Sequence, residues 1–411
     1  MPTTEGRAAR MQQIPATREE FVRNSGILLS LGAGAVILCG VIQAASAQDK
    51  VKLAIVAEIT GGGAPSGTMF RDGVLLGIGD VNKSGGILGK QLEASVADTQ
   101  SDPPTSVAVM RRTVNDEPFA IFGTVYSSST VANMAIARQA GIPQFSGSES
   151  VAVVDKGNPN IFLTSYSQAM GFKKLVNWMV KGLKAEKIAL IYVNDAFGIG
   201  GRTEFKKYLN ELGETLVADI STEVQQADFT PELVKVRDSG ATHLMVYSHE
   251  EEDARLIIQL HQMGLHVQAV GDNLCAQTTI NAGGGAINGA KCQVPMTANS
   301  PLPAMGKVAE EFEAQYGHLP DHNGFKGYIG VYMLKAAVER VGTWNQQKLR
   351  DCLHDNLFTA ADTSGLLMDT YIFGNGDADR ESFIVEIKNG KPVVSQVLGL
   401  VGGPYKKHSC T

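Results

Sequence analysis

The chain is organised around one segment, Gly123-Thr124-Val125-Tyr126-Ser127-Ser128-Ser129-Thr130. An apolar run typical of a buried strand, residues 119–122, leads into it, and a helical pattern, residues 131–137, follows it. A run of hydroxyl groups therefore lies where a strand ends and a helix begins. In an open α/β sheet, ligands bind at the carboxyl ends of the strands.

Two interpretations of this hydroxyl run stay open from the segment alone. The first turn of a helix has unpaired N–H groups and a partial positive charge. Hydroxyl groups beside those N–H groups would make a site for a carboxylate or another anion. Alternatively, one serine caps the helix and the other hydroxyls belong to a solvated loop.

The N-terminus reads as a targeting segment. Four arginines make its start basic, residues 26–42 are apolar, and Ala45-Ser46-Ala47 has the form of a cleavage site. We predict a secretory signal peptide over residues 1–47. A single membrane anchor is the alternative, but the apolar run is short and glycine-rich. Leu38 precedes Cys39 where lipid attachment needs a small residue, which argues against a lipoprotein.

The composition of the mature chain excludes some partners. The whole chain has 36 Lys and Arg and 42 Asp and Glu. Residues 1–47 hold four and three of these, so the remainder has 32 and 39, a net charge of −7. Without a basic run, nucleic acid is not an expected partner. No later stretch is long and apolar enough to span a bilayer, and the length suits two domains.

Four cysteines remain after the signal peptide: Cys275, Cys292, Cys352 and Cys410. An even number in an exported chain permits disulfides, with three possible pairings. The spacings do not resemble a zinc site. Cys275 and Cys292 flank a glycine-rich segment, so we predict that these two approach each other, which leaves Cys352 and Cys410 over.

A first strand, residues 51–57, is followed by a glycine-rich loop, residues 58–67, and a helical pattern, residues 70–81. The glycines do not have the G-x-G-x-x-G spacing, and no acidic residue ends a second strand about 20 residues on. Lys90 follows a glycine but precedes Gln91, so there is no P-loop. We therefore expect no nucleotide, metal or other cofactor.

Short apolar runs then alternate with helical patterns along the chain. Strands are predicted at residues 91–97, 119–122, 144–146, 187–193, 215–220 and 242–247. Helices are predicted at residues 105–115, 172–183, 203–212 and 232–239, and another starts at Ser248. This alternation is typical of parallel sheets covered on both faces. The predicted fold class is α/β, with two doubly wound parallel-sheet lobes.

The pattern resembles a known family. Blocks that match its motifs in order lie at residues 71–89 (with Gly85-Gly86-Ile87-Leu88-Gly89), 98–103, 121–130, 141–143, 194–198, 228–230 and 240–246. Each block is weak by itself, but their order and spacing together resemble the branched-chain amino-acid type of periplasmic binding protein, which serves ABC importers. The resemblance covers nearly all of the mature chain.

The resemblance implies a type I periplasmic-binding-protein fold, in which three crossing strands form a hinge between two lobes. The crossings would lie near Tyr166, Val294 and Ser382. The implied domain limits are residues 48–167 plus 295–380 for the N-terminal lobe and 168–294 plus 381–411 for the C-terminal lobe. Closure of the cleft around a ligand would be a hinge motion.

The resemblance also implies a binding site. The family holds a carboxylate with the serine run and a nearby strand end, which implies as ligand-binding residues Tyr126, Ser127, Ser128, Ser129, Ser148 and Ser150. The family's first loop commonly holds an aromatic residue, where this chain has Ser66. In the second lobe, Phe197 fills the aromatic position and would cover an apolar side chain. Alternatively, Phe197 packs in the core beside Ile199.

The chain departs from the family where the ligand's amino group is held. The family uses a tyrosine and an acid, which fall near His249 or Glu250 and at Asp272 or Asn273. The aromatic is missing, but Glu250 or Asp272 could meet the positive charge. If one of these acids faces the cleft, the solute carries a cation as well as an anion. If both point to solvent, a neutral amide or a plain carboxylate is favoured.

The acidic run at residues 248–253 has a simpler interpretation. Ser248 and Glu251 have the S-x-x-E spacing of a capping box, and acids are favourable at a helix N-terminus. A metal site formed by His249 and these acids would lack a second histidine at helical spacing.

These observations predict an exported, periplasmic, monomeric protein that captures a small polar solute and delivers it to a membrane permease, without catalysing a reaction. The alternative in another class is a sensing domain for amides or aromatic acids that feeds a receptor. A hydrolase using the serine run is a third possibility. It lacks G-x-S-x-G and an evident histidine and aspartate to activate a serine.

Overall fold

The computed structural model describes residues 50–410. The predicted signal peptide therefore lies outside the described residues. Within residues 50–410, none of the helices combines the length and apolarity needed to cross a bilayer.

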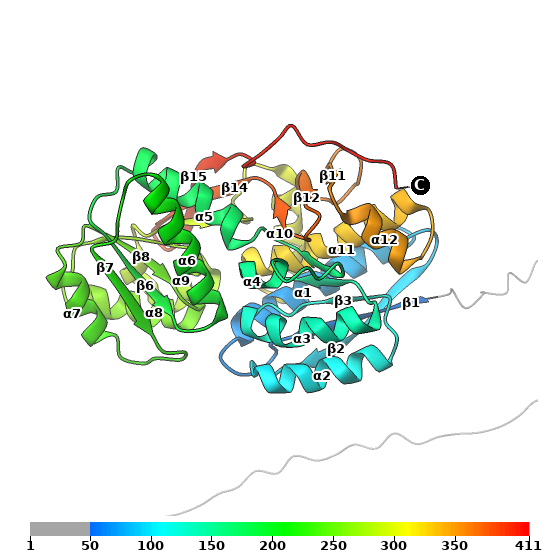
Figure 1. Cartoon of the computed structure of the whole chain (residues 1–411), viewed down its shortest axis with the longest axis horizontal. Coiled ribbons are helices and arrows are strands. Elements are labelled where there is room, and N and C mark those ends of the chain that lie inside the picture. Colours follow the sequence, from blue (N-terminus) through cyan, green and yellow to red (C-terminus); the bar gives the residue numbers. More distant parts are fainter. Residues whose placement is uncertain (1–49, 411) are drawn as a thin grey trace, which may run out of the picture. The chain divides into compact units, whose positions relative to one another are not determined.

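The first sheet has five parallel strands in the order β2-β1-β3-β4-β5 (Figure 1). The strands are β1 (Lys50–Ala57), β2 (Gln91–Asp98), β3 (Ala120–Phe122), β4 (Gln144–Ser146) and β5 (Ile161–Leu163). Three of them, β3, β4 and β5, are buried along their whole length. This explains why they read as continuous apolar runs rather than as alternating ones.

Helices from two distant parts of the chain belong to this first lobe. They are α1 (Ala64–Lys83), α2 (Pro103–Asn115), α3 (Ser127–Ala140), α4 (Val151–Val154), α10 (Pro303–Tyr316), α11 (His322–Val341) and α12 (Gln346–Leu353). The α1 and α11 helices pack closely against each other. Helix α1 begins earlier than predicted, which places Ser66 in its first turn rather than in a loop.

The second sheet has seven strands in the order β15-β14-β10-β9-β8-β6-β7. They are β6 (Ile188–Val193), β7 (Ala218–Thr222), β8 (His243–Tyr247), β9 (Gln268–Gly271), β10 (Lys291–Val294), β14 (Ser382–Lys388) and β15 (Lys391–Leu398). Five strands are parallel, as predicted, and the edge strands β14 and β15, which were not predicted, are antiparallel. A two-residue turn, Asn389-Gly390, with positive φ at both residues, joins them.

The helices of the second lobe are α5 (Gln168–Asn177), α6 (Ala196–Glu211), α7 (Thr230–Asp238), α8 (Glu250–Gln262) and α9 (Gln277–Gly283). A π-helical turn, Trp178–Gly182, continues α5, and 3₁₀ turns occupy Asn273–Cys275 and Gly284–Ile287. Strand and helix alternate as predicted, with parallel strands that are covered by helices.

The chain passes between the two sheets after β5, after β10 and before β14. A third, small antiparallel sheet of β11 (Asn356–Phe358), β12 (Thr370–Ile372) and β13 (Ala378–Asp379) was not predicted. These strands are only two or three residues long, too short for a periodic pattern to be visible. The residue limits of the two lobes stay a prediction.

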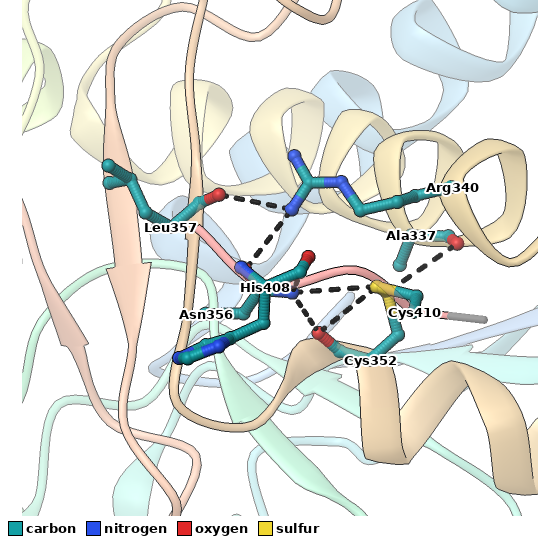
Figure 2. Close-up of a disulfide and its surroundings, with 7 residues drawn as sticks. All are labelled: Ala337, Arg340, Cys352, Asn356, Leu357, His408 and Cys410. Carbon is teal, nitrogen blue, oxygen red and sulfur yellow. Dashed lines mark hydrogen bonds between the residues drawn. A yellow bond between two sulfur atoms is a disulfide. The ribbon is translucent and has the colours of Figure 1, made fainter. Parts of the chain in front are cut away.

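The four cysteines at positions 275, 292, 352 and 410 form two disulfides. The Cα atoms of Cys275 and Cys292 are 6.0 Å apart and their sulfurs are bonded, which confirms the predicted approach. Cys352 in α12 is bonded to Cys410 (Figure 2). Asn356 supports this second bridge, since its side-chain amide donates to the Cys352 carbonyl at 2.8 Å.

The C-terminal tail, residues 399–410, leaves β15 in the second sheet and ends beside α12 (Figure 1). The Tyr405 ring stacks on Tyr371 of β12, with ring centroids 3.8 Å apart. Its hydroxyl donates to Asp379 of β13 at 2.6 Å. The predicted second lobe includes residues 381–411, and this limit stays a prediction. The tail packs on elements that follow α11.

Candidate ligand-binding site

The first wall of the site is built where β3 ends and α3 begins. The structure confirms the predicted turn, since β3 ends at Phe122 and α3 begins at Ser127. Gly123 is required there, because its φ is +104° and a Cβ would lie 2.0 Å from the Val56 carbonyl oxygen. The turn brings the first N–H groups of α3 to the edge of the sheet, where a helix start can receive an anion. The Glu58 carboxylate already accepts from the Val125 N–H there at 3.1 Å.

The predicted serines do not form one common socket. Ser127 lines the cavity between the lobes, and its hydroxyl lies 2.8 Å from that of Ser148. Ser129 is fully buried next to Glu58 and is not among the residues that line this cavity. Burial raises the pKa of Glu58 to about 7 despite hydrogen bonds from backbone and hydroxyl groups.

Two of the predicted serines instead connect the lobes directly. The Ser128 hydroxyl accepts a hydrogen bond from the Ala196 N–H at 3.4 Å, and the Ser150 hydroxyl donates to the Ala196 carbonyl at 3.1 Å. Ser150 also caps α4 by accepting from the Ala152 N–H. These serines therefore contact the start of α6, and the structure does not place them on the cavity wall.

The second wall is formed by the N-terminal ends of α6 and α8. Asp195 caps α6 by accepting from the N–H groups of Phe197 and Gly198, both at 2.9 Å. Its other oxygen lies 3.1 Å from His249 Nε2. Burial alone would lower the pKa of His249, but the hydrogen bond and charge of Asp195 outweigh it and raise the pKa to about 9. Burial raises the pKa of Asp195, but the hydrogen bond and positive charge of His249 outweigh burial, so that the pKa of Asp195 is lowered overall.

Aromatic rings from both lobes meet at this wall. The rings of Tyr126, in the first lobe, and His249, in the second, stack with centroids 4.2 Å apart. Phe197 lines the cavity and also stacks on Tyr247 at 4.2 Å. It does pack in a core cluster, but not beside Ile199 as in the alternative prediction, because Ile199 is exposed. The His249 ring thus lies at one of the two positions near which the resemblance places a tyrosine.

Glu250 faces the other lobe rather than solvent. Its Oε1 accepts hydrogen bonds from Ser66 Oγ of α1 at 2.6 Å and from Asn323 Nδ2 of α11 at 3.1 Å. The residue is 3% exposed. Of the two alternatives stated for Glu250, the structure therefore shows the one in which the acid faces the cleft. Ser66, which stands where the family commonly has an aromatic residue, is a hydrogen-bond partner of Glu250.

The predicted capping box of α8 is wrong by one position. His249 is the N-cap residue, and its N–H donates to Glu252 Oε2 at 3.3 Å. Ser248 does not cap, because its hydroxyl donates to the Asp253 carboxylate. Glu251 is exposed. Helix capping therefore explains the position of Glu252. It does not explain Glu250, the first residue of α8, whose side chain faces the cleft.

The cavity between the two walls is small, about 30 Å³. Residues from both lobes line it: Ser66, Val125, Tyr126, Ser127, Gly147, Glu149, Phe197, His249, Glu250, Asn273, Asn323 and Lys326. The lining contains positive and negative side chains together with aromatic faces. A small solute with a carboxylate, an ammonium group and an apolar part would find a complement to each of them.

The sequence prediction missed Lys326, Glu149 and Asn323. Lys326 Nζ lies 2.6 Å from Glu149 Oε1, and both side chains are buried; the contact is a close pairing of charges rather than an aligned hydrogen bond. The available signal was the single lysine in the apolar and glycine-rich first half of α11. Glu149 lies between two serines that were predicted, so an acid at the same strand end could have been included.

Asp272 lies outside this cavity, in a neighbouring one that also borders Glu149. Its pKa is raised well above the usual range, first because the side chain is buried and second because Glu149 is close. The assignment of Asp272 as a ligand-binding residue stays a prediction, and the structure separates it from Glu250, the acid that joins the lobes.

Comparison with known proteins agrees with this architecture. The family profile described as periplasmic binding protein matches residues 50–392. A leucine-, isoleucine-, valine-, threonine- and alanine-binding protein of Pseudomonas aeruginosa is 26% identical over 326 residues, covering 79% of this chain and 87% of the relative. A Leu/Ile/Val-binding protein homologue of Brucella melitensis is 25% identical over 322 residues, with 76% and 85% covered.

Solved structures show the same fold at lower sequence identity. A leucine-binding protein from Thermotoga maritima superimposes with a TM-score of 0.75 at 21% identity, covering 85% of this chain and 99% of its own. A solute-binding protein from R. palustris in complex with benzoate gives a TM-score of 0.78 at 20% identity, with 87% and 98% covered. The chain belongs to the periplasmic binding protein family.

Proposed function

We propose that this protein is the substrate-binding component of an ABC importer, which captures a small amino acid or a related carboxylate between its lobes. The observation that carries the proposal is the polar cavity lined by both lobes, with Glu250 bonded across it to Ser66 and Asn323. The amino-acid-binding relatives in Pseudomonas and Brucella support the substrate class.

Three groups have distinct roles in the proposed complex. The carboxylate of the solute lies at the start of α3, near the Ser127 hydroxyl and the free N–H groups. Its ammonium group lies near Glu250, because a buried cation needs an acidic partner. Its side chain lies against the rings of Phe197 and Tyr126. Ser128 and Ser150 then stabilise lobe closure rather than contact the solute.

The wider biological setting belongs to the same proposal. The chain is exported to the periplasm through the signal peptide predicted at residues 1–47, acts as a monomer and delivers its solute to a membrane permease. The lobes are residues 48–167 plus 295–380 and residues 168–294 plus the β14–β15 hairpin. Binding closes the lobes about the three crossings, and the permease recognises the closed form.

A matched pair of solutes tests the proposal. L-leucine and 4-methylpentanoate share a carbon skeleton and a carboxylate, but only leucine has an ammonium group. By calorimetry we expect Glu250→Gln to weaken leucine binding by about 1.5–3 kcal/mol, the range for a hydrogen bond to a charged group. It should change the binding of 4-methylpentanoate or benzoate, if either binds, much less. Ser127→Ala should weaken all of them.

The control is Glu251→Gln, which removes an exposed acid one residue away. It should leave the affinities unchanged within about twofold, because solvent screens an exposed charge. The proposal fails if no amino acid or carboxylate raises the melting temperature of the mature protein. The assigned role of Glu250 alone fails if its substitution weakens leucine and 4-methylpentanoate equally.

A further inference from the structure

A second cavity lies beside the first, at the passage of the chain between the lobes. It is small, about 20 Å³, which is room for one group of the size of an ammonium ion or a water molecule. Its lining comes from the first crossing, α5, the ends of strands β8, β9 and β10, and Glu149 in the loop after β4. Glu149 borders both cavities, so the second one, the hinge cavity, adjoins the proposed solute site.

Aromatic rings form much of the hinge cavity. Tyr166, Phe172 and Tyr247 are each less than 5% exposed, and the rings of Phe172 and Tyr247 meet edge to face at 5.0 Å. Such walls suit either an apolar group or a cation, because aromatic faces attract positive charge. The polar side chains of the cavity decide between these two classes of group.

The decisive side chain is Asp272. It is 91% buried, being 9% exposed, and its Oδ1 has no hydrogen-bond partner among the described residues. Lys326, a cation near this acid pair, is already matched by Glu149 at 2.6 Å. Two further cations lie on the Tyr166 side of the cavity, where Lys174 Nζ is 4.7 Å from the centroid of the Tyr166 ring and Arg380 is also close. Asp272 is therefore a surplus buried acid, which needs either a proton or a positive group from outside the chain.

We propose that the hinge cavity is a second subsite that binds the cationic end, an ammonium or guanidinium group, of an elongated amino acid. The proposal rests on the proposed function, because the solute's carboxylate must lie at Ser127 in the first cavity. The solute then passes Glu149, and its far end lies between the aromatic walls with Asp272 as its partner. An apolar solute would leave Asp272 unpaired and protonated.

The simpler alternative is that Asp272 stays permanently protonated against Glu149 and has no ligand. The two cases differ in what a distal cation does. If Asp272 is a cation partner, binding of a basic amino acid expels the proton from Asp272. If the proton is permanent, a distal cation would lose its hydration without gaining an acidic partner, so a solute with an apolar end should bind better.

L-lysine and L-norleucine provide the test, because they differ only in the group at the end of the side chain. Calorimetry on the disulfide-bonded mature protein should show lysine binding roughly tenfold or more tightly than norleucine. Asp272→Asn should remove that preference by weakening lysine while norleucine changes by less than about twofold. Glu251→Gln, which removes an exposed acid of α8, should keep the preference.

A second measurement does not need the variant to fold. Lysine titrations in buffers of different ionisation enthalpy should show release of a proton that norleucine titrations lack. The groups near Asp272 that share this proton balance are Glu149, Glu250, Lys326, Tyr166 and Tyr247. Equal or tighter norleucine binding would overturn this proposal and leave the proposed function standing. Binding of neither amino acid would also overturn this proposal, whereas the proposed function fails only if no amino acid or carboxylate binds.

Discussion

At the scale of single residues, His249 is a charged group held at the contact of the two lobes. Its ring lies between Asp195, which accepts its hydrogen bond, and Tyr126, which stacks on it from the other lobe. Glu250 and Glu252 add negative charge nearby. Two contacts therefore favour the protonated imidazole: Asp195 accepts a hydrogen bond at the edge of the ring, and the Tyr126 ring lies against its face.

We expect His249 to stabilise the protein in a pH-dependent way. Its pKa is about 9 in the folded protein and 6.5 in a model compound. Because folding raises the pKa of a base, the stabilisation is complete below about pH 6.5 and is lost as the pH rises through about 9. Below pH 6.5, His249→Gln should reduce the free energy of unfolding by on the order of 3 kcal/mol. This difference should shrink toward pH 10.

Urea unfolding from pH 5 to 10 measures this difference, and the imidazole proton signals in NMR report the pKa directly. Buried acids such as Glu58 also titrate in this range, so the wild type must be compared with the variant at each pH. Asp195→Asn is the matched variant and should lower the pKa of His249. A constant difference between wild type and His249→Gln across the range would contradict the assignment.

At the scale of elements, the site depends on how closely α1 approaches α11. Ser66 and Asn323, the two partners of Glu250, lie on these helices. Their close packing requires small residues, because a Cβ on Gly73 would lie 1.9 Å from the Gly324 carbonyl oxygen. A Cβ on Gly327 would lie 2.1 Å from the Phe70 carbonyl oxygen. These glycines set the distance between the helices that carry the two groups.

Two alanine substitutions in the same helix should have opposite effects. Gly73→Ala forces α1 away from α11 and should destabilise the protein by about 1–3 kcal/mol. Gly79→Ala meets no atom within 4 Å and should stabilise it by up to about 1 kcal/mol through helix propensity. Chemical unfolding of the two variants provides the measurement. If both variants were destabilised, the contact between α1 and α11 would not be the reason for the effect of Gly73→Ala.

At the scale of the whole molecule, the C-terminal tail links the two lobes, in addition to the three crossings of the chain. It begins in the second sheet and is bonded by Cys410 to α12, which follows α11 of the first lobe. The bond closes a segment with a sequence separation of 58, while the Cys275–Cys292 bond closes one of 17. Loop-closure entropy assigns more stabilisation to the longer segment.

Replacing both Cys352 and Cys410 by serine should therefore lower the free energy of unfolding by about 4 kcal/mol. Replacing Cys275 and Cys292 by serine should lower it by about 3 kcal/mol. Urea unfolding of the oxidised proteins tests the order of the two effects. Unchanged stability without Cys352 and Cys410 would show that the noncovalent contacts of Tyr405 already hold the tail.

Much of the fold could be predicted from local sequence. The alternation of apolar strands and helical patterns predicted both lobes, because parallel strands buried on two faces read as continuous apolar runs. The antiparallel edge was missed, although Asn389-Gly390 is a strong hairpin signal. The short sheet of β11 to β13 left no periodic pattern to read.

The site was predictable only in part, because a cleft is made by residues that are distant in the chain. Local sequence was enough to predict that the hydroxyl run begins a helix at a strand end, and that acids follow β8 and β9. The packing of the two lobes was needed to show that Ser127 lines the cavity while Ser128 and Ser150 join the lobes. It also brought Lys326 and Asn323 into the site from α11. Side-chain direction depends on how helices from separate parts of the chain pack, and local sequence does not encode that packing.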